Sequence, residues 1–335
     1  VLSEKGVLGS MFSPGNLDAL PLVVKHGLGA KIIHAVLART APDRDAVVDD
    51  HRSLTYGEMN AEINRVAHYL SDEYDVGPGS KVLIMMENRA EYLVTWMALN
   101  RLEASPVHTS YGLKPDELDY QVQDSEGTVI LVSERSASSA LEVREQLDQP
   151  LSVIGVDDLG EDDVASYHEA VQSYPDTFPD VESTDERTEN IVYTSGTTGD
   201  PKGASRQLET PNEFLSEIGF ISEGLGLLEE LPMSAGDRQL IVTPVYHSAG
   251  QFLSLIQMVL AGTVYLRPDF EARDTLEKLS EWDINNVFLV ATLIRRILDL
   301  PEEVLDSNPT PELRGMMFSA APFPQNLRER TIEQF

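Results

Sequence analysis

The 335-residue sequence has no cysteine, and only seven of its 25 basic residues are lysine. The absence of cysteine excludes disulfide bonds, thiolate catalysis and zinc sites with cysteine ligands. It leaves the compartment open but agrees with a cytoplasmic protein. No apolar run predicts a membrane span, because the longest one, "FLSLIQMVLAG", is interrupted by Ser254 and Gln257. The chain starts at Val1 without a signal-peptide pattern, so we expect a fragment or a processed product.

Acidic residues outnumber basic ones by 56 to 25, so the formal net charge is -31. Two explanations stay open. The source could have a salt-rich cytoplasm, in which ions screen the repulsion between carboxylates, or the surface is simply acidic and well solvated. Either explanation disfavours long-range attraction of nucleic acids or anionic lipids, so we expect no nucleic-acid partner. An anionic ligand would have to be held by a local cluster of donors.

The order of elements predicts an α/β fold. From Ser53 onward, short apolar runs typical of buried strands alternate with helical patterns, beginning with "SLTY" and a capping box of Thr55 and Glu58 for a helix through Tyr69. Such repetition favours parallel sheets covered by helices. The expected strands of the first part are "KVLIMM", "ASPVHTS", "TVILVS" and "LSVIGV".

Residues 156–190 interrupt this alternation. They contain twelve acidic residues and one arginine, which predicts an exposed connection with at most one short helix. A second block follows, with expected strands "NIVYTS", "RQLIVTP", "TVYLR", "NVFLVA" and "GMMFSA" and a helical region from about Pro211. We therefore predict two βαβ-type lobes. The first covers 1–185, with an N-terminal helical segment that could pack on the second lobe, and the second, incomplete lobe covers 186–335.

The segment "YTSGTTGDPKG" (193–203) carries the clearest chemistry. Its glycines permit close approach of backbone N–H groups, its hydroxyl side chains add donors, and Lys202 adds a compact positive charge, so the segment suits phosphate oxygens. It begins where a strand ends, which is where open α/β sheets bind ligands. It is not a Walker A loop, because Gly199 is followed by Asp200 and Pro201 rather than by lysine. The alternative is a Gly/Thr-rich turn without a ligand.

This ordered string resembles the signature of the acyl-adenylate-forming (AMP-binding) enzymes, and most of all that of fatty-acid and other acyl-CoA synthetases. Two further segments resemble family motifs in the same order, "TPVYHSAG" (243–250) and "FSAAPFP" (318–324). The regions "LTYGEMNAEINRVAHYL" and "ENRAEYLVTWMALNRLEASPV" also resemble the first lobe of these enzymes, so the resemblance covers nearly the whole chain.

The resemblance implies ATP-dependent activation of a carboxylic acid, expected to be a fatty acid, with Mg²⁺ and CoA. The acid attacks the α-phosphate of ATP, pyrophosphate leaves, and the CoA thiol then displaces AMP. The β- and γ-phosphates would be held by Thr194, Ser195, Gly196, Thr197, Thr198, Gly199 and Lys202. The adenine would lie along the backbone of Ser319, Ala320, Ala321 and Pro322. An alternative for this last segment is tight helix–strand packing.

His247 would act near the substrate carboxylate at the mouth of the acyl pocket, and Tyr246 and Phe252 would line that pocket. Core packing is the simpler explanation for most of the helix that carries Phe252. Arg206 would supplement Lys202 or lie on the surface. His108 and Tyr111 stand where many relatives have an asparagine-containing segment. Because this sequence departs from that pattern, the roles of both residues stay undecided. The other histidines lack the spacing of metal ligands.

The sequence contains no Tyr-Gly-x-Thr-Glu segment after "FSAAPFP". The resemblance places there a glutamate that helps to bind Mg²⁺, followed by a ribose-binding aspartate and a C-terminal domain with the adenylation lysine. We therefore expect this chain to be part of an N-terminal domain and to be inactive alone. The expected partners are a small carboxylic acid, ATP and CoA, and a homodimer remains open. The alternatives are an aryl-CoA ligase and a non-catalytic nucleotide-binding module.

Overall fold

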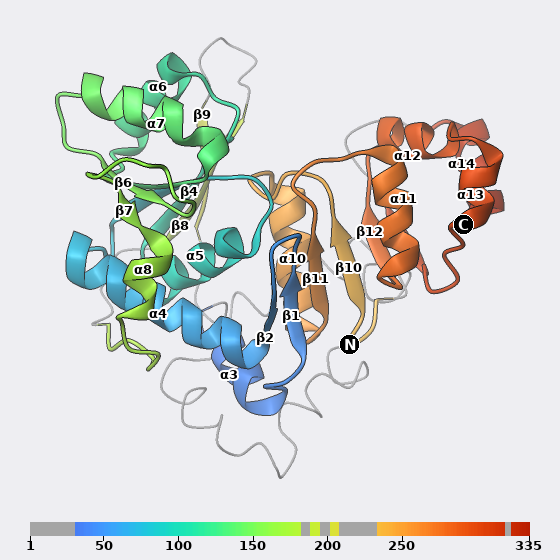
Figure 1. Ribbon diagram of the computed structural model, residues 1–335, viewed down its shortest axis with the longest axis horizontal. Helices are drawn as coiled ribbons and strands as arrows, with labels where there is room; N and C mark the ends of the chain where they lie inside the picture. Colours follow the sequence, from blue (N-terminus) through green and yellow to red (C-terminus); the bar gives the residue numbers. More distant parts are fainter. Residues whose placement is uncertain (1–30, 182–187, 195–201, 208–232, 319–322) are drawn as a thin grey trace. The chain divides into compact units, whose positions relative to one another are not determined.

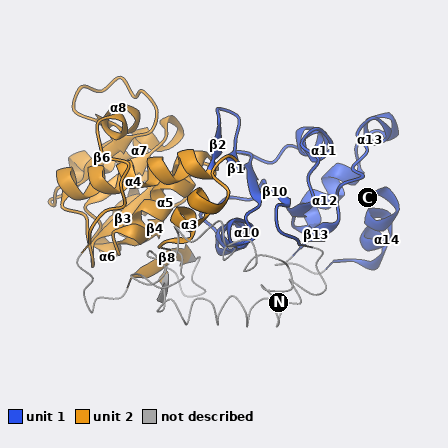
Figure 2. Cartoon of the chain, turned by 90° about the horizontal axis from the view of Figure 1, so that it is seen from below, with its two compact units in different colours: residues 1–16, 44–55, 217–335 blue, residues 17–43, 56–216 orange. Residues whose placement is uncertain are grey.

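Figure 1 presents the computed structural model, which describes residues 31–181, 188–194, 202–207, 233–318 and 323–335. The chain divides into two units, each built on its own mainly parallel sheet (Figure 2). Unit 1 comprises Val1–Asn16, Arg44–Thr55 and Glu217–Phe335, and unit 2 comprises Leu17–Asp43 and Tyr56–Ser216. The predicted α/β class with parallel sheets flanked by helices is confirmed.

Unit 2 has a seven-stranded sheet. All neighbouring strands run parallel except the last two, which are antiparallel. The order across the sheet is β7 (Ala165–Ser166), β6 (Ser152–Gly155), β5 (Val129–Val132), β3 (Lys81–Met85), β4 (Ser105–His108), β8 (Glu189–Thr194) and β9 (Lys202–Gln207). The helices are α3 (Ile33–Thr40), α4 (Tyr56–Tyr74), α5 (Ala90–Arg101), α6 (Pro115–Ser125), α7 (Glu134–Gln146) and α8 (Tyr167–Gln172).

The sheet of unit 2 is buried on both faces, which explains its continuous apolar strands. Leu83 and Met85 point into a core shared with α6 and α7, whereas the alternating neighbours Val82 and Ile84 are fully buried on the opposite face. Helix α5 packs on β3 and β4, and all twelve of its residues are buried. A helix without a polar face is stable only when protein surrounds it. Helix α4 in turn packs on α5 and runs five residues past its expected end at Tyr69.

Unit 1 has a six-stranded sheet, parallel except for one antiparallel pair, β1 and β2. Its order is β13 (Gly315–Met317), β12 (Asn286–Phe288), β10 (Arg238–Ile241), β11 (Thr263–Leu266), β1 (Asp45–Val48) and β2 (Ser53–Thr55). Its helices are α10 (Ser248–Val259), α11 (Ala272–Glu281), α12 (Ala291–Leu298), α13 (Glu302–Ser307) and α14 (Gln325–Gln334).

One hydrophobic cluster organises unit 1. It joins the sheet to α11, α12, α13 and α14, and α12 supplies Ala291, Ile294, Ile297 and Leu298 at helical spacing. Helix α10 packs on β10 and β11 and does not take part in this cluster. Among the described helices of both units, none is long and apolar enough to cross a membrane.

The division of the chain differs from the expected boundary at 185/186. Strands β8 and β9 follow that boundary, yet β8 pairs with β4, and β9 with β8, in the sheet of unit 2. The hairpin of β1 and β2 precedes it by more than a hundred residues, yet β1 pairs with β11 in unit 1. Pairing in a parallel sheet depends on which faces can be buried together, so sequence order did not reveal this exchange. The predicted short helix in the acidic connection is α8, and the helical region expected from Pro211 lies mostly outside the described residues.

Candidate functional site

The predicted phosphate segment joins two paired strands in unit 2. Strands β8 and β9 form an antiparallel pair from Glu189↔Gln207 to Thr194↔Lys202. The residues between Thr194 and Lys202 therefore connect two backbone positions that lie opposite each other. Ser195, Gly196, Thr197, Thr198 and Gly199 lie outside the described residues, as do Asp200 and Pro201.

This hairpin starts at the edge of the sheet where ligands of α/β proteins bind. Strand β8 runs parallel to β4, with Val107↔Ile191 and His108↔Val192 in register. Thr194 is the last residue of β8, so the segment begins at the same edge as the carboxyl ends of β3 and β4. The segment was expected to follow a strand, and it does follow one. That strand, β8, belongs to the sheet of unit 2 and not to that of the second lobe, in which the segment was expected.

Tyr193 fixes one face of β8. Its hydroxyl donates to Asp124 Oδ2 at 2.7 Å, at the end of α6. Burial, followed by this hydrogen bond, raises the pKa of Tyr193 far above its ordinary value, so the phenol stays protonated and keeps donating. Tyr193 therefore ties the strand that leads into the predicted phosphate segment to α6.

His108 fixes the other face of β8. It is 2% exposed, its Nε2 lies 2.7 Å from Asn190 Oδ1, and its Nδ1 lies 2.6 Å from the Tyr92 hydroxyl. The role of His108, undecided from the sequence, is thus structural in the first instance. Tyr111 lies under the Arg135 guanidinium at 4.9 Å, away from β8. The sequence motifs did not single out Asn190. Its contact with His108 became apparent only from the pairing of β8 with β4.

The second predicted group lies in unit 1, after β10. His247 is the residue before the first turn of α10, and its ring contacts that of Tyr246 with centroids 4.5 Å apart. His247 is exposed and Tyr246 partly buried, so both present side chains to solvent or to a ligand. Partial desolvation lowers the pKa of His247 below its ordinary 6.5, so the imidazole is mainly neutral at pH 7 and able to accept a proton.

Backbone contacts set the turn that presents these two rings. The His247 N–H donates to the Pro244 carbonyl at 3.1 Å, and Gln251 donates through Nε2 to the Tyr246 carbonyl. A Cβ at Gly250 would lie 3.0 Å from the Pro244 carbonyl oxygen, a contact so tight that the backbone of residue 244 would have to shift by a few tenths of an ångström. Gly250 therefore allows α10 to start directly against residues 244–247. The motif text contained this glycine, but its role was apparent only from the packing.

The side chains of helix α10 divide into those that pack in the hydrophobic core and one that belongs to the candidate site. Leu253 and Ile256 are 3% and 2% exposed, so they belong to the core, as core packing predicted. Phe252 is only partly buried, on a different side of the helix, and remains the candidate for contact with a substrate.

The third predicted group follows β13 at the same edge of the unit 1 sheet. Ser319, Ala320, Ala321 and Pro322 lie outside the described residues, but the residues on both sides of them are placed. The rings of Phe318 and Phe323 contact each other with centroids 4.2 Å apart. This contact brings the two ends of the segment together. Phe318 is 45% exposed, which is unusual for a large apolar side chain in this chain.

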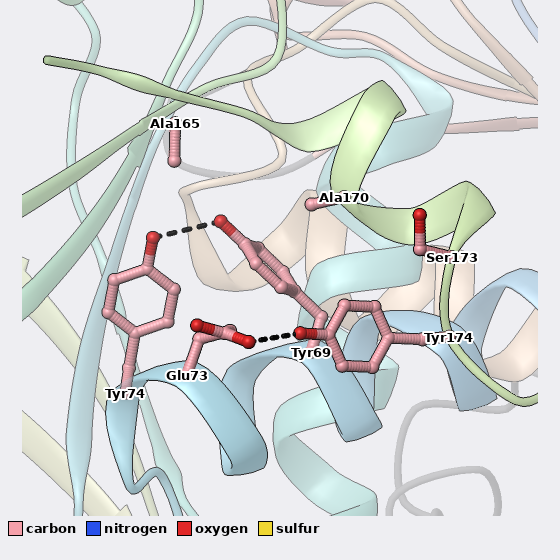
Figure 3. A pocket seen from close by; sticks show the side chains of 7 residues that line it. All are labelled: Tyr69, Glu73, Tyr74, Ala165, Ala170, Ser173 and Tyr174. Carbon is pink, nitrogen blue, oxygen red and sulfur yellow. Dashed lines mark hydrogen bonds between the residues drawn. The ribbon is translucent and has the colours of Figure 1, made fainter.

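A surface pocket of about 450 Å³ also lies in unit 2 (Figure 3). It is lined by Tyr69, Glu73, Tyr74, Ala165, Ala170, Ser173 and Tyr174. Its polar groups already bind one another: Tyr174 donates to Glu73 at 2.5 Å, and the hydroxyls of Tyr69 and Tyr74 lie 2.8 Å apart. The bond to Glu73 raises the pKa of Tyr174 to about 12. None of the sequence-predicted site residues lines this pocket.

Sequence comparison shows which known proteins this chain is similar to. The chain is 25% identical over 307 residues to a 3-oxocholest-4-en-26-oate–CoA ligase of Rhodococcus rhodochrous, covering 87% of this chain and 55% of that protein. It is also 25% identical over 298 residues to a 2-succinylbenzoate–CoA ligase of Bacillus subtilis, with 89% and 55% covered. The chain thus spans about half the length of the curated relatives it matches.

The fold matches a solved domain. The N-terminal domain of FACL13 from Mycobacterium tuberculosis superposes with a TM-score of 0.77 at 22% identity, covering 92% of this chain and 73% of that one. At this identity, the likeness establishes the fold alone. The family model of the AMP-binding enzymes matches residues 35–335, and the chain belongs to this family.

Proposed function

We propose that the protein containing this chain activates a carboxylic acid in two steps. In the first, a carboxylate oxygen bonds to the α-phosphorus of ATP, the bond to the β-phosphate oxygen breaks, and acyl-AMP and pyrophosphate form. In the second, the CoA thiol loses its proton, its sulfur bonds to the acyl carbon, and AMP leaves. The observation that carries the proposal is the cross-strand pairing of Thr194 with Lys202, which closes the family's characteristic segment into a hairpin.

Unit 2 would contribute the phosphate-binding part. Backbone N–H groups near glycine and hydroxyl side chains are donors that suit the oxygens of the leaving pyrophosphate. The residues proposed for this role are Thr194, Ser195, Gly196, Thr197, Thr198, Gly199 and Lys202. Lys202 would offset the negative charge that develops on the leaving group. A net charge of -31 makes such local donors necessary for an anionic substrate.

Unit 1 would contribute contacts to the acid and the adenine. His247, mainly neutral at pH 7, can donate a hydrogen bond to the carboxylate without a full charge, and Tyr246 and Phe252 offer partly buried apolar surface. Ser319, Ala320, Ala321 and Pro322 are proposed to pass along the adenine. The contact of Phe318 with Phe323 supports this role, because it holds the ends of that small-residue segment together.

Magnesium is part of the proposal only for the longer protein. Within the part of the chain that the structure describes, no group of three or more His, Asp or Glu residues could hold a metal ion. No step is assigned to the metal.

The acid is proposed to be a fatty acid, with an aryl acid as the alternative. The equal identity to a ligase of a steroid acid and to a ligase of succinylbenzoate supports a broad class of acids. Because the chain spans 55% of these relatives, we propose that residues 1–335 alone are inactive. The cytoplasmic location and the homodimer stay predictions, testable by cell fractionation and light scattering.

The test is acid-dependent exchange of pyrophosphate into ATP by the full-length protein, over a panel of fatty and aromatic acids with CoA-dependent AMP release. Lys202→Ala should lower the exchange rate about a hundredfold while changing the affinity for the acid less. Lys278→Ala is the matched control, because Lys278 pairs with Glu281 on the surface of α11. Exchange at the parent rate in Lys202→Ala removes Lys202 from the mechanism. ATP binding without exchange for any acid would favour a non-catalytic nucleotide-binding module.

A further inference from the structure

His108 joins three elements of unit 2 at one buried point. It ends β4, it hydrogen-bonds Tyr92 of α5, and it hydrogen-bonds Asn190 of β8. Its ring stacks on Tyr92 at 5.8 Å and meets Trp96 edge-on at 5.4 Å. Two hydrogen bonds and two aromatic neighbours leave the ring a single orientation.

The hydrogen bonds also fix the proton on the ring. Asn190 Oδ1 can only accept, so His108 Nε2 carries the hydrogen and donates it. His108 Nδ1 is then the acceptor for the Tyr92 hydroxyl. Burial lowers the pKa of His108 to about 4, so the ring is neutral at pH 7 and this arrangement holds. Tyr92, His108 and Asn190 thus form a directed, uncharged chain of hydrogen bonds.

These hydrogen bonds lie where β8 joins β4. The register between β4 and β8 consists of two residue pairs, Val107↔Ile191 and His108↔Val192. Side chains of β4 also contact the start of β8: Ser105 Oγ accepts from the Glu189 N–H at 2.9 Å, and His108 binds Asn190. Strand register is strongly specified only where side chains enforce it.

We propose that His108 is a positioning residue for ATP. Through Asn190 it holds β8 in register on β4, and so it fixes the positions of Thr194 and of its cross-strand partner Lys202, the two residues that flank the predicted phosphate segment. His108 itself touches no substrate in this proposal, which rests on the function proposed above. It assigns a role to a residue outside the three family motifs and predicts that its loss affects ATP rather than the acid.

The test uses the full-length protein and two substitutions that remove the same hydrogen bond. His108→Phe keeps an aromatic ring but loses both hydrogen bonds, and Asn190→Leu removes the acceptor on β8. Each should raise the KM for ATP roughly tenfold, while the KM for the acid changes less than twofold. The double variant should be no worse than either single one, because the energies of residues in one contact are not additive. His108→Gln, which can still donate and accept, should restore most of the ATP affinity.

His51→Phe is the matched control, since His51 is exposed in the β1–β2 hairpin of unit 1. An equal change of both KM values, or no change in either, overturns the proposal. If His108→Phe does not fold, Asn190→Leu and His108→Gln decide it. If the parent protein shows no exchange, calorimetric titration with ATP decides it: about tenfold weaker binding in the variants supports the positioning role. Unchanged binding, or no binding by the parent, overturns that role.

Discussion

The two units bury different kinds of polar group. In the described residues, unit 2 buries arginine, histidine and glutamate, including Arg89, Arg101, His34 and His108, all at most 5% exposed. Unit 1 buries no arginine or histidine among the described residues; it buries amides and hydroxyls, among them the fully buried Gln239, Gln257 and Asn286, and the aspartates Asp49 and Asp237. An amide cannot change its charge, whereas buried ionisable groups keep one protonation state at a free-energy cost. Unit 2 should therefore respond to pH and to loss of a partner far more than unit 1.

The largest effect should come from the ion network of Arg89. Its guanidinium binds Glu91 at 2.8 Å and Asp157 at 2.9 Å, and Glu91 is 2% exposed. Arg89→Met removes the nearest cation from the buried Glu91 carboxylate, which should lower the free energy of unfolding by about 3–5 kcal/mol. Urea unfolding at pH 7 measures it.

Unit 1 supplies the matched comparison for this change. Arg314 pairs with the buried Asp237, but Asp237 also accepts from the Ser234 N–H at 2.8 Å and from Asn286 Nδ2 at 3.0 Å. Arg314→Met should therefore cost less, about 2 kcal/mol, because those donors remain. The exposed pair of Arg330 with Asp299 is the control, worth at most about 1 kcal/mol. Equal losses in Arg89→Met and Arg314→Met would contradict the contrast between the units.

The next effect concerns pH. Burial lowers the pKa of His34 to about 3 and that of His108 to about 4, whereas a histidine exposed to water, as in the unfolded chain, has a pKa of 6.5. Between those values the unfolded chain binds more protons than the folded one, so stability falls as the pH falls below 6.5. Each histidine should account for about 2 kcal/mol lost between pH 7 and pH 5.

Urea unfolding of variants tests this contribution. In His34→Gln and in His108→Gln, the difference between pH 7 and pH 5 should shrink by about 2 kcal/mol. His247→Gln should shrink that difference less, because His247 in unit 1 is only partly desolvated and its pKa is lowered in the same direction but not to the values of the two buried histidines. A pH dependence identical to that of the parent protein in all three variants would show that the buried histidines of unit 2 do not control its acid stability.

The smallest effect compares two motif glycines. Gly250→Ala places a Cβ 3.0 Å from the Pro244 carbonyl oxygen, whereas a Cβ at Gly203 would lie 3.4 Å from side-chain atoms of Ile191 and Tyr193, an ordinary contact. After the gain in helix propensity, Gly250→Ala should cost about 1 kcal/mol and raise the KM for the acid by displacing residues 244–247. Gly203→Ala should leave both quantities nearly unchanged. A larger loss in Gly203→Ala would reverse this ranking.

Local signals predicted much of the fold. Each expected strand from "KVLIMM" to "GMMFSA" corresponds to a strand of the structure, and α8 is a short helix within the described part of the acidic connection. Apolar runs and turn residues are properties of neighbouring positions, so the sequence reports them directly. The β1 strand (Asp45–Val48) was not expected, because four residues with a charged start give little periodic signal.

The sequence predicted which segments contribute to the candidate site, but not how their residues are arranged in space. The sequence identified the segments around Lys202, His247 and Ser319, and the structure places the ends of each at the carboxyl edge of a sheet. The sequence did not identify Asn190 or the need for Gly250 beside Pro244. Those roles depend on atoms brought together from distant positions, such as the 82 residues between His108 and Asn190.

By itself, the sequence determined the α/β class, the order of elements and the family's three segments, because propensity and motif order are local. Only the tertiary structure decided that β8 and β9 complete the sheet of unit 2 and that β1 and β2 complete that of unit 1. It also decided which buried charges meet their partners. Both outcomes depend on burying surfaces from distant parts of the chain at once, and no local pattern encodes which distant surface will be covered.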